Sequence, residues 1–402
     1  MFPRIAIVGA GPCGLYLAKN LRGRVSPGAR VDIFDRLSQP LGLLRFGVAP
    51  DTISIRQSGK TLLAGATERF FFNVRVGTDL TIDELMRYYH VCLLSCGAES
   101  PRPFNISGDD TEGVFDALDI VRCYNGHPDT PQTVLSYLHN LVHLARPIKV
   151  CVVGNGNVAL DVARILLTPA KAFEHTDISR EFLKILERID VRSVRVIGRR
   201  GIFQSSFTNP ELRRITETQH FIPFTDHEYI EQSCKYQPAT LDRRIQRRLA
   251  LFQHIANNST TINAKVRQLH FDFFKGVHSI EKGANSALKG LILEHNILDE
   301  NLNAHATEKR SRVDADMFVK SIGFQRSPDS LQLLEKVDSK RIFSCGWFAT
   351  NGKGDLSATL AATVQLSAII RGLNFDFPVE EDILDFFKGN TKFKNVRVGN
   401  TG

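Results

Sequence analysis

Two glycine-rich loops, each between an apolar strand and a helix, constrain the fold of this chain more than any other feature. The first loop is Gly9-Ala-Gly11-Pro-Cys13-Gly14, after the apolar run 5–8, and the second is Gly154-Asn-Gly156-Asn157-Val158-Ala159, after the apolar run 150–153. In such a loop the first glycine makes a tight turn, and the second lets backbone N–H groups approach a pyrophosphate. The third small residue lets the helix pack on the strand. One loop is a weak signal, but two predict an α/β fold with two dinucleotide-binding domains and parallel sheets.

The segment after the first loop predicts which cofactor it takes. The alternating run Val31-Asp-Ile-Phe-Asp35 ends in a carboxylate roughly 20 residues after Gly14. A carboxylate at this position accepts hydrogen bonds from a ribose diol and repels a 2′-phosphate. The first loop is therefore expected to bind FAD or NAD.

The segment after the second loop differs. The strand-like run 194–198 carries no acid and ends in Arg199 and Arg200. Guanidinium groups pair bidentately with phosphate oxygens, so these residues predict a site for the 2′-phosphate of NADP. The alternative is that the two arginines only cap a strand at the surface. Together the two loops predict a flavoprotein that takes hydride from a nicotinamide.

Composition places the chain among soluble globular proteins of two or three domains, with 402 residues, 43% apolar and 23% charged. No apolar run approaches the roughly 18 residues of a membrane span. Met1–Arg4 leads directly into the first strand, so no signal or transit peptide is visible: either the chain needs none, or it was removed. The seven cysteines include no Cys-x-x-Cys, which argues against a disulfide reductase, and the closest pair, Cys92 and Cys96, is interpreted as small core residues.

The net charge of +8 raises the question of an acidic partner. The densest basic segment is 242–252, in which two pairs of arginines are spaced four apart and so share one helix face: Arg243 with Arg247, and Arg244 with Arg248. This face is either merely solvated or a docking site. Nucleic acid is disfavoured, because no aromatic residues interleave with the arginines and no recognition motif is present.

Turn residues suggest where the chain passes between domains. Pro101-Arg-Pro103 and Ile106-Ser-Gly108 predict an exit from the first domain, and the strand-like run 316–323 predicts the return. The expected organisation is a discontinuous FAD-binding domain, 1–107 and 326–402, around an NADP-binding domain, 108–325.

Several finer elements are also predicted. The second domain is expected to hold an antiparallel excursion from 261–266 to 291–295, with a turn at 281–286 and a polar loop at 299–312. In the first domain, 342–347 is the expected last strand and 357–373 an expected helix. That helix has apolar residues at helical spacing: Leu360, Ala361, Val364, Ala368 and Ile369.

Four segments resemble the adrenodoxin reductase family, which are ferredoxin–NADP reductases of the glutathione-reductase fold. They are Leu41–Asp51, Gly154–Pro169 with Thr176-Asp-Ile178, Gly198–Gly201 with Phe207-Thr208 and Glu211-Leu-Arg213, and Gly346-Trp347. The resemblance runs from Ile5 to about Leu373. It implies two Rossmann-like domains of the glutathione-reductase type, each with three layers.

The resemblance also implies residue roles. FAD would contact Gly9, Gly11, Cys13, Gly14, Asp35, Leu43, Val76, Trp347, Gly354, Asp355 and Leu356. NADP would contact Gly156, Asn157, Val158, Ala159, Arg199, Arg200, Glu211 and Gly354. Docking of a ferredoxin would fall on Arg244 and Arg248, and no metal site is implied.

The implied activity is an NADPH–ferredoxin reductase. Hydride would pass from NADPH to FAD, and single electrons to an acidic [2Fe–2S] ferredoxin of the adrenodoxin type, supporting iron–sulfur cluster assembly or monooxygenases. The resemblance further implies a monomer in the mitochondrial matrix or a related organelle, with the cytoplasm as the alternative. Two other readings are a flavoprotein donor to a different acceptor and an FAD- and NADP-binding interaction protein with little turnover.

The chain departs from the family pattern in two places near the expected flavin. Thr52 and Ile53 stand where the family has His-Pro, so a proton relay through that histidine is not expected. The loop 348–356 also differs from the family's Arg-Gly-Pro-x-Gly-Val-Ile. Asp161 is a candidate for ordering water near the flavin, beside the alternative that it is a structural helix carboxylate.

Overall fold

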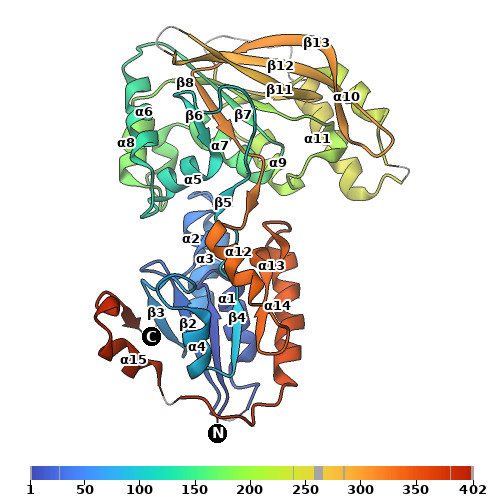
Figure 1. Ribbon diagram of the computed structural model, residues 1–402. Helices are drawn as coiled ribbons and strands as arrows, with labels where there is room; N and C mark the ends of the chain where they lie inside the picture. The colour runs from blue at the N-terminus through green and yellow to red at the C-terminus, as the bar shows by residue number, and fades with distance from the viewer. Residues whose placement is uncertain are drawn as a thin grey trace. The chain divides into compact units, whose positions relative to one another are not determined.

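The computed structural model describes residues 2–26, 28–238, 240–257, 266–283, 286–380 and 382–399. The chain forms two compact units, which are described separately (Figure 1). The first unit is Met1–Val48, Thr52–Ser100 and Phe324–Gly402, and the second is Ala49–Asp51 and Pro101–Gly323. The units divide at 100/101 and 323/324, beside the predicted domain boundaries at 107/108 and 325/326. No sequence signal pointed to the assignment of Ala49–Asp51 to the second unit.

The first unit is built on a six-stranded sheet in the order β16-β4-β1-β2-β3-β17. Its strands are β1 (Arg4–Val8), β2 (Arg30–Asp35), β3 (Arg69–Phe72), β4 (Val91–Leu94), β16 (Ile342–Ser344) and β17 (Arg397–Gly399). All pair in parallel except β17, which is antiparallel to β3. The helices are α1 (Pro12–Leu21), α2 (Leu43–Phe46), α3 (Ile53–Leu63), α4 (Ile82–Tyr88), α12 (Pro328–Glu335), α13 (Gly346–Thr350), α14 (Leu356–Arg371) and α15 (Ile383–Gly389).

Side chains of β1 alternate between two hydrophobic cores, because successive residues of a strand point to opposite faces. Ile5 and Ile7 pack with Leu17 of α1 and with Ile370 of α14. Ala6 and Val8 lie in the other core, which includes residues of α4 and α15. Burial on both faces explains why this strand reads as a continuous apolar run.

The second unit contains a parallel six-stranded sheet in the order β6-β14-β7-β8-β10-β9. Its strands are β6 (Val114–Asp116), β7 (Ile148–Val153), β8 (Val191–Ile197), β9 (Ile222–Thr225), β10 (Gln268–Asp272) and β14 (Met317–Lys320). The helices are α5 (Ala117–Asn125), α6 (Gln132–Val142), α7 (Asn157–Leu167), α8 (Arg180–Leu186), α9 (Asn209–Thr216), α10 (His227–Cys234) and α11 (Arg243–Asn257). The predicted return strand at 316–323 corresponds to β14.

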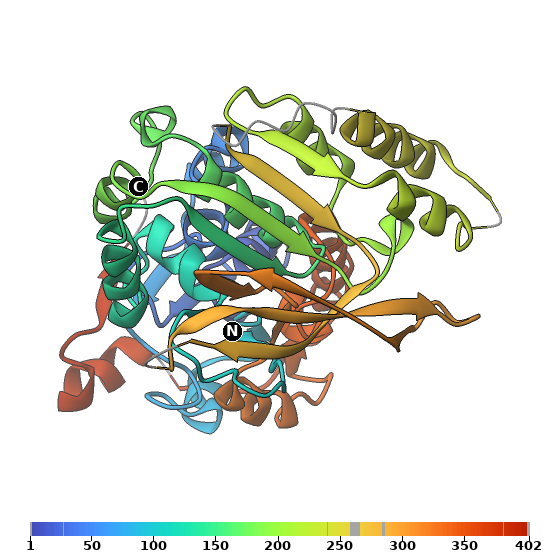
Figure 2. The same cartoon turned by 90° about the horizontal axis from the view of Figure 1, so that it is seen from above.

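The second unit also contains a separate antiparallel sheet, whose strand bounds differ in part from those predicted for the antiparallel excursion. It consists of β11 (Lys275–Lys282), β12 (Leu288–Leu298) and β13 (Ala304–Asp314), seen side by side in amber to orange in Figure 2. The predicted first arm at 261–266 lies almost wholly outside the described residues. The predicted turn at 281–286 begins too early, since residues 281 and 282 end β11. The polar loop predicted at 299–312 is wrong from residue 304 onward.

The misassigned strand β13 is polar because it is an edge strand with little burial. All of its residues are exposed or partly exposed, and its charged residues include Lys309, Arg310 and Arg312. Charged side chains on an edge strand hinder pairing with other chains. The alternation of apolar and polar residues that identifies a strand is therefore missing in β13, because an edge strand favours charged residues.

The predicted helix at 357–373 is α14, but its apolar stripe is not the face that packs in the core. The buried residues are Thr359, Thr363, Leu366, Ser367 and Ile370, and the side-chain amide of Asn20 on α1 donates to Thr363 at 3.3 Å. The predicted stripe, Leu360, Ala361, Val364, Ala368 and Ile369, is exposed to solvent instead. Small and hydroxylated residues allow α1 and α14 to approach closely, which the search for large apolar residues did not detect.

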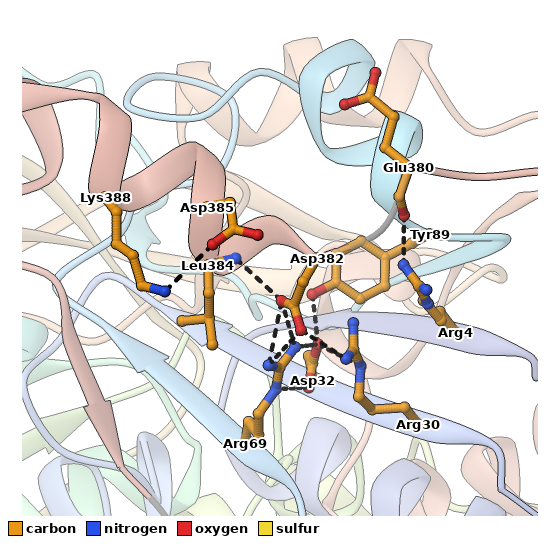
Figure 3. Close-up of polar contacts among 10 residues, drawn as sticks. All are labelled: Arg4, Arg30, Asp32, Arg69, Tyr89, Glu380, Asp382, Leu384, Asp385 and Lys388. Atoms are coloured by element: carbon orange, nitrogen blue, oxygen red, sulfur yellow. Dashed lines mark hydrogen bonds and ion pairs between the residues drawn. The ribbon is translucent and has the colours of Figure 1, made fainter.

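The C-terminal segment is held on the first unit by an ion network around Arg69 (Figure 3). The Arg69 guanidinium donates to both carboxylate oxygens of Asp32, at 2.9 and 2.6 Å, and to Asp382 at 3.0 Å. Arg30 also donates to Asp382 at 2.8 Å. Tyr89 donates its hydroxyl to Asp32 at 2.6 Å, and Asp32 is fully buried.

Candidate functional site

The first glycine loop has the geometry of a pyrophosphate cradle. Gly9 follows β1 with φ +107°, and a Cβ there would lie 2.6 Å from the Ser95 carbonyl oxygen. A Cβ on Gly14 would lie 1.9 Å from the Gly9 carbonyl oxygen, so α1 packs too closely for a side chain. Around Gly11, the N-cap of α1, a Cβ would meet nothing within 4 Å. The space at the helix N-terminus is therefore open to a phosphate group.

Asp35 stands at the end of β2 beside this loop. One carboxylate oxygen accepts from the Ala10 N–H at 2.6 Å and the other from the Leu37 N–H at 2.8 Å. Burial raises the pKa of Asp35, while these two N–H groups oppose the shift. The neighbouring Arg36 is paired with Glu99 at 2.7 Å, so its charge is neutralised. The Asp35 carboxylate and the pairing of Arg36 with Glu99 thus disfavour a 2′-phosphate at this position, and the first loop suits FAD.

The predicted residues Trp347 of α13, Gly354 and Asp355 of the loop after it, and Leu356 at the start of α14 belong to one closed segment. The indole Nε1 of Trp347 donates to the Gly354 carbonyl at 2.9 Å. Its ring stacks on Phe324, with ring centroids 5.8 Å apart. Asp355 caps α14 by accepting from the Ala358 N–H at 2.9 Å, and Leu356 begins the helix. The loop that departs from the family pattern is therefore ordered by its own bonds.

Cys13 and Cys345 connect this loop to the first glycine loop. Their thiols are hydrogen-bonded, which raises the pKa of Cys13 and lowers that of Cys345. A Cβ on Gly346 would lie only 2.7 Å from the Cys13 sulfur, so the start of α13 lies against α1. Sequence reasoning missed this pair because the two cysteines lie near opposite ends of the chain.

Leu43 and Val76 differ in accessibility. Leu43 begins α2 and is 41% exposed, so its side chain can contact a ligand. Val76 is buried in a core cluster with Phe71 and Leu80. Its predicted contact with FAD stays a prediction.

The second glycine loop repeats the geometry of the first. Gly154 has φ +126°, and a Cβ there would lie 2.0 Å from the Ser321 carbonyl oxygen. Gly156, the N-cap of α7, faces open space. Asn157 begins α7 and accepts from the Thr208 N–H at 2.8 Å through its side-chain oxygen. Ala159 is fully buried and Val158 partly so, which leaves the backbone of the loop as the ligand surface.

Arg199 and Arg200 follow β8 as two cations without a counter-ion among the described residues. Burial and the charge of Arg199 lower the pKa of Arg200. Their carbonyl oxygens are fixed, because the Asn296 amide donates to Arg199 at 3.1 Å and the Phe274 N–H to Arg200 at 3.3 Å. A phosphate dianion would relieve the repulsion between the guanidinium groups, so the site fits the 2′-phosphate of NADP.

A network of alternating charges joins two predicted site residues, Asp161 of α7 and Glu211 of α9. Arg164 donates to Asp161 at 2.8 Å and also to Asp51. Arg214 pairs with Asp51 at 3.1 Å and with Glu211 at 3.2 Å. Burial raises the pKa of Asp161 to about 6, with Arg164 acting in the opposite direction. The alternative of a structural carboxylate gains support from these bonds, and the role of Asp161 in ordering water stays a prediction.

The two arginines predicted to dock a partner both lie on the basic helix α11, but they differ in exposure and in hydrogen bonding. Arg244 is exposed, as are Arg243 and Arg247. Arg248 instead donates to the carbonyl oxygens of Ser205 at 2.8 Å and Phe207 at 2.7 Å. Its guanidinium therefore stabilises the segment that follows the two arginines 199 and 200.

The sequence of this chain is similar to one family model and to several known proteins. A family model for an NAD(P)-binding Rossmann-like domain matches residues 7–67. The mitochondrial NADPH:adrenodoxin oxidoreductase of Arabidopsis thaliana is 34% identical, over 81% of this chain and 68% of that relative. A probable mitochondrial NADPH:adrenodoxin oxidoreductase of Schizosaccharomyces pombe is 32% identical, over 89% of this chain and 79% of the relative. The alignment with the human enzyme, at 39% identity, spans only 44% of that protein.

Solved structures show the same similarity. FprA of Mycobacterium tuberculosis in complex with NADPH superimposes with a TM-score of 0.81 at 26% identity, over 92% of this chain and 84% of FprA. A second FprA structure gives a TM-score of 0.82 at 27% identity. No helix in the described residues is long and apolar enough to cross a bilayer.

Proposed function

Because the chain belongs to the NADPH:adrenodoxin oxidoreductase family, we propose that it passes electrons from NADPH to a small acidic [2Fe–2S] ferredoxin. Family membership confirms the predicted α/β fold class and the prediction of an NADPH-dependent ferredoxin reductase. It likewise confirms FAD and NADP as the cofactors. An adrenodoxin-type ferredoxin is the partner that the relatives indicate.

The difference between the two nucleotide loops carries the proposal. Asp35 is held beside the first loop, whereas Arg199 and Arg200 after the second loop have no counter-ion in the part of the chain that the structure describes. FAD, when bound, accepts hydride from NADPH and gives up single electrons. The residues of the chain bind and orient the two nucleotides. In our proposal they are those predicted above for FAD and NADP, and Asp161 and Trp347 are the candidate catalytic residues.

The site favours this function over a binding protein with little turnover. That alternative rested on the altered loop after Trp347, which the structure shows to be internally bonded rather than open. A donor to a different acceptor would use the same two cofactor sites, so only the partner distinguishes it. We further propose a mitochondrial location, as in the relatives, and a role in iron–sulfur cluster assembly or with monooxygenases.

We expect the purified protein to carry a flavin whose visible absorption bleaches with NADPH under anaerobic conditions. NADH should bleach it far less at equal concentration, because it lacks the phosphate that Arg199 and Arg200 bind. The measurement is a titration of the absorbance spectrum with each nucleotide. A bound flavin that NADPH leaves oxidised would overturn the proposed activity.

The double variant Arg244→Glu with Arg247→Glu should slow ferredoxin reduction at low ionic strength by about tenfold or more, with a smaller effect at high salt. NADPH-driven reduction of ferricyanide, a small acceptor, should be unchanged. The matched control is Lys184→Glu with Arg188→Glu, which changes the charge equally on exposed residues of α8 and of the turn that follows it. Equal slowing by both double variants would remove α11 as the docking surface. Arg248 is unsuitable for this test because it stabilises the Ser205–Phe207 segment.

A further inference from the structure

The two glycine loops meet their neighbouring strands in the same way, so the residues that follow β2 and β8 can be matched one to one. In the first sheet the Gly9 N–H donates to the Phe34 carbonyl at 2.7 Å. In the second sheet the Gly154 N–H donates to the Ile197 carbonyl at 2.9 Å. The residue before each glycine also pairs with that same strand residue. Phe34 of β2 is therefore the counterpart of Ile197 of β8.

The next two positions show one difference and one agreement between the loops. Asp35 is the counterpart of Gly198, where a Cβ would collide with the Asn155 side chain, so no acid fits in the second loop. Arg36 is the counterpart of Arg199. The first loop thus carries an arginine at the position that in the second loop is proposed to bind the 2′-phosphate of NADP.

The two matched arginines differ in what they contact. Arg36 donates through Nε to a carboxylate oxygen of Glu99 at 2.7 Å, and the two side chains are only 20% and 24% exposed. An ion pair shielded in this way is screened less by solvent and salt than an exposed one. Arg199 has no carboxylate partner in the described part of the chain. The charge of the first arginine is therefore balanced within the protein, and that of the second is not.

Glu99 also accepts from Arg75, at 3.0 Å, but Arg75 has a second carboxylate nearby, that of Asp329 at 3.5 Å. Loss of the Glu99 charge would therefore affect Arg36 more than Arg75. Burial is the largest cause of the raised pKa of Asp35, and among the nearby charges Arg36 lowers this pKa while Glu99 raises it. The pair thus lies close to the carboxylate expected to contact the ribose.

We propose that Glu99 is a second specificity-determining residue of the first loop. Asp35 repels a 2′-phosphate directly, and Glu99 acts through Arg36 by occupying the guanidinium that would otherwise bind the phosphate. The chain would in this way keep NADP out of a loop that has the arginine of an NADP site. This inference rests on the proposed function, in which the first loop holds FAD.

Competition between FAD and two adenine nucleotides tests the proposal. The FAD-loaded full chain is equilibrated with 5′-ADP or with 2′,5′-ADP, in urea below the unfolding transition and at a level where 5′-ADP releases half of the FAD. Released FAD is read from its fluorescence, and the result is the ratio of the two nucleotide concentrations that release equal amounts. Binding at the second loop is the same for all the variants below and cancels from the comparison.

The wild type should need about tenfold or more 2′,5′-ADP than 5′-ADP. Glu99→Gln should lower this ratio by about tenfold or more, the factor expected for one charge-assisted hydrogen bond to the phosphate. Glu99→Asp keeps the charge and should stay near the wild type. A wild type without preference, or a ratio that Glu99→Gln leaves unchanged, overturns the proposal.

Arg36→Ala shows whether Glu99 acts through Arg36. In the Arg36→Ala background, Glu99→Gln should change the ratio little, since the guanidinium that it would release is absent. The matched control is Asp329→Asn, which removes a carboxylate beside Arg75 and should leave the ratio as in the wild type. Equal effects of Glu99→Gln with and without Arg36 would contradict the proposed route.

Glu99→Ala also releases Arg36 and replaces Glu99→Gln if that variant does not load with FAD. Failure of both variants to load would show that Glu99 holds the fold of the site rather than its specificity, and would overturn the proposal. The proposed function is tested separately by the bleaching of the wild-type flavin with NADPH. Bleaching together with an unchanged ratio in Glu99→Gln would reject only the role of Glu99.

Discussion

The variant with Arg199→Ala and Arg200→Ala should show a KM for NADPH raised by about 10²–10³-fold, while the kinetics with NADH change little. Hydrogen bonds from charged groups contribute about 1.5–3 kcal/mol each, so losing two guanidinium partners of one phosphate costs about 3–6 kcal/mol, and the lower part of this range, about 3–4 kcal/mol, corresponds to the expected change in KM. The effect should be large because neither arginine has another counter-ion among the described residues, and Arg200 is partly buried. The measurement is steady-state reduction of ferricyanide with each nucleotide.

The control for this variant is Arg188→Ala, an exposed arginine of the same unit that should leave both nucleotides unaffected. The FAD spectrum should be unchanged in all three proteins, since the first loop lies in the other unit. Equal losses for NADPH and NADH would show that Arg199 and Arg200 hold the loop rather than the phosphate. The alternative of surface strand caps would then be correct.

Arg69→Met should lower the free energy of unfolding by about 3–5 kcal/mol, the range found when one partner of a buried ion pair is removed. The reason is that Asp32 is fully buried and would keep only Tyr89 at 2.6 Å and the more distant Arg30 at 3.5 Å. The measurement is unfolding by denaturant, followed by circular dichroism. Adding Asp32→Asn to Arg69→Met should recover part of the loss, because the unpaired buried charge disappears.

Arg87→Ala is the matched control, since Arg87 also pairs with a carboxylate of the C-terminal segment. Its partner is Glu380 at 2.6 Å, but both side chains are about half exposed. An exposed pair is screened by solvent and contributes little to stability, so this variant should be nearly as stable as the wild type. Similar losses for Arg69→Met and Arg87→Ala would contradict the importance of burial.

The same network gives stability a dependence on acid. Burial raises the pKa of Asp382, but hydrogen bonds from Arg69 and the Leu384 N–H, and the charges of Arg30 and Arg69, lower it to about 2. The folded pKa is below the ordinary value of 3.8, so this contribution is present above about pH 4 and is lost as the pH falls towards 2. In Arg69→Met this part of the acid dependence should be weaker.

Local features of the fold could be predicted from the sequence, because a few neighbouring residues determine them. The two glycine loops are examples, since Gly9 and Gly154 adopt positive φ beside a neighbouring strand. Asp35 at the end of β2 and the two arginines after β8 also lie where their sequence distances placed them. Such motifs carry their own geometry, so one sequence is enough to recognise them.

Features that depend on distant residues could not be predicted. Arg164 contacts Asp51, 113 residues earlier in the chain, and nothing near either residue indicates the other. The burial of Arg248 was hidden because its partners are backbone carbonyls, which leave no mark in a sequence. Helix periodicity identified α14 but not its packed face, because Thr359, Thr363 and Ser367 fill the core without being apolar.

The assignment of Ala49–Asp51 to the second unit has a consequence for synthesis on the ribosome. These three residues emerge early, but Arg164 and Arg214, which bind Asp51, follow more than a hundred residues later. The first unit must also wait for β16 and α14, which are made after the entire second unit. The four N-terminal strands of the sheet therefore remain without β16 and β17 through most of translation, with apolar surface that a chaperone would cover. For the same reason, neither unit can be cut out as a continuous fragment with all of its contacts.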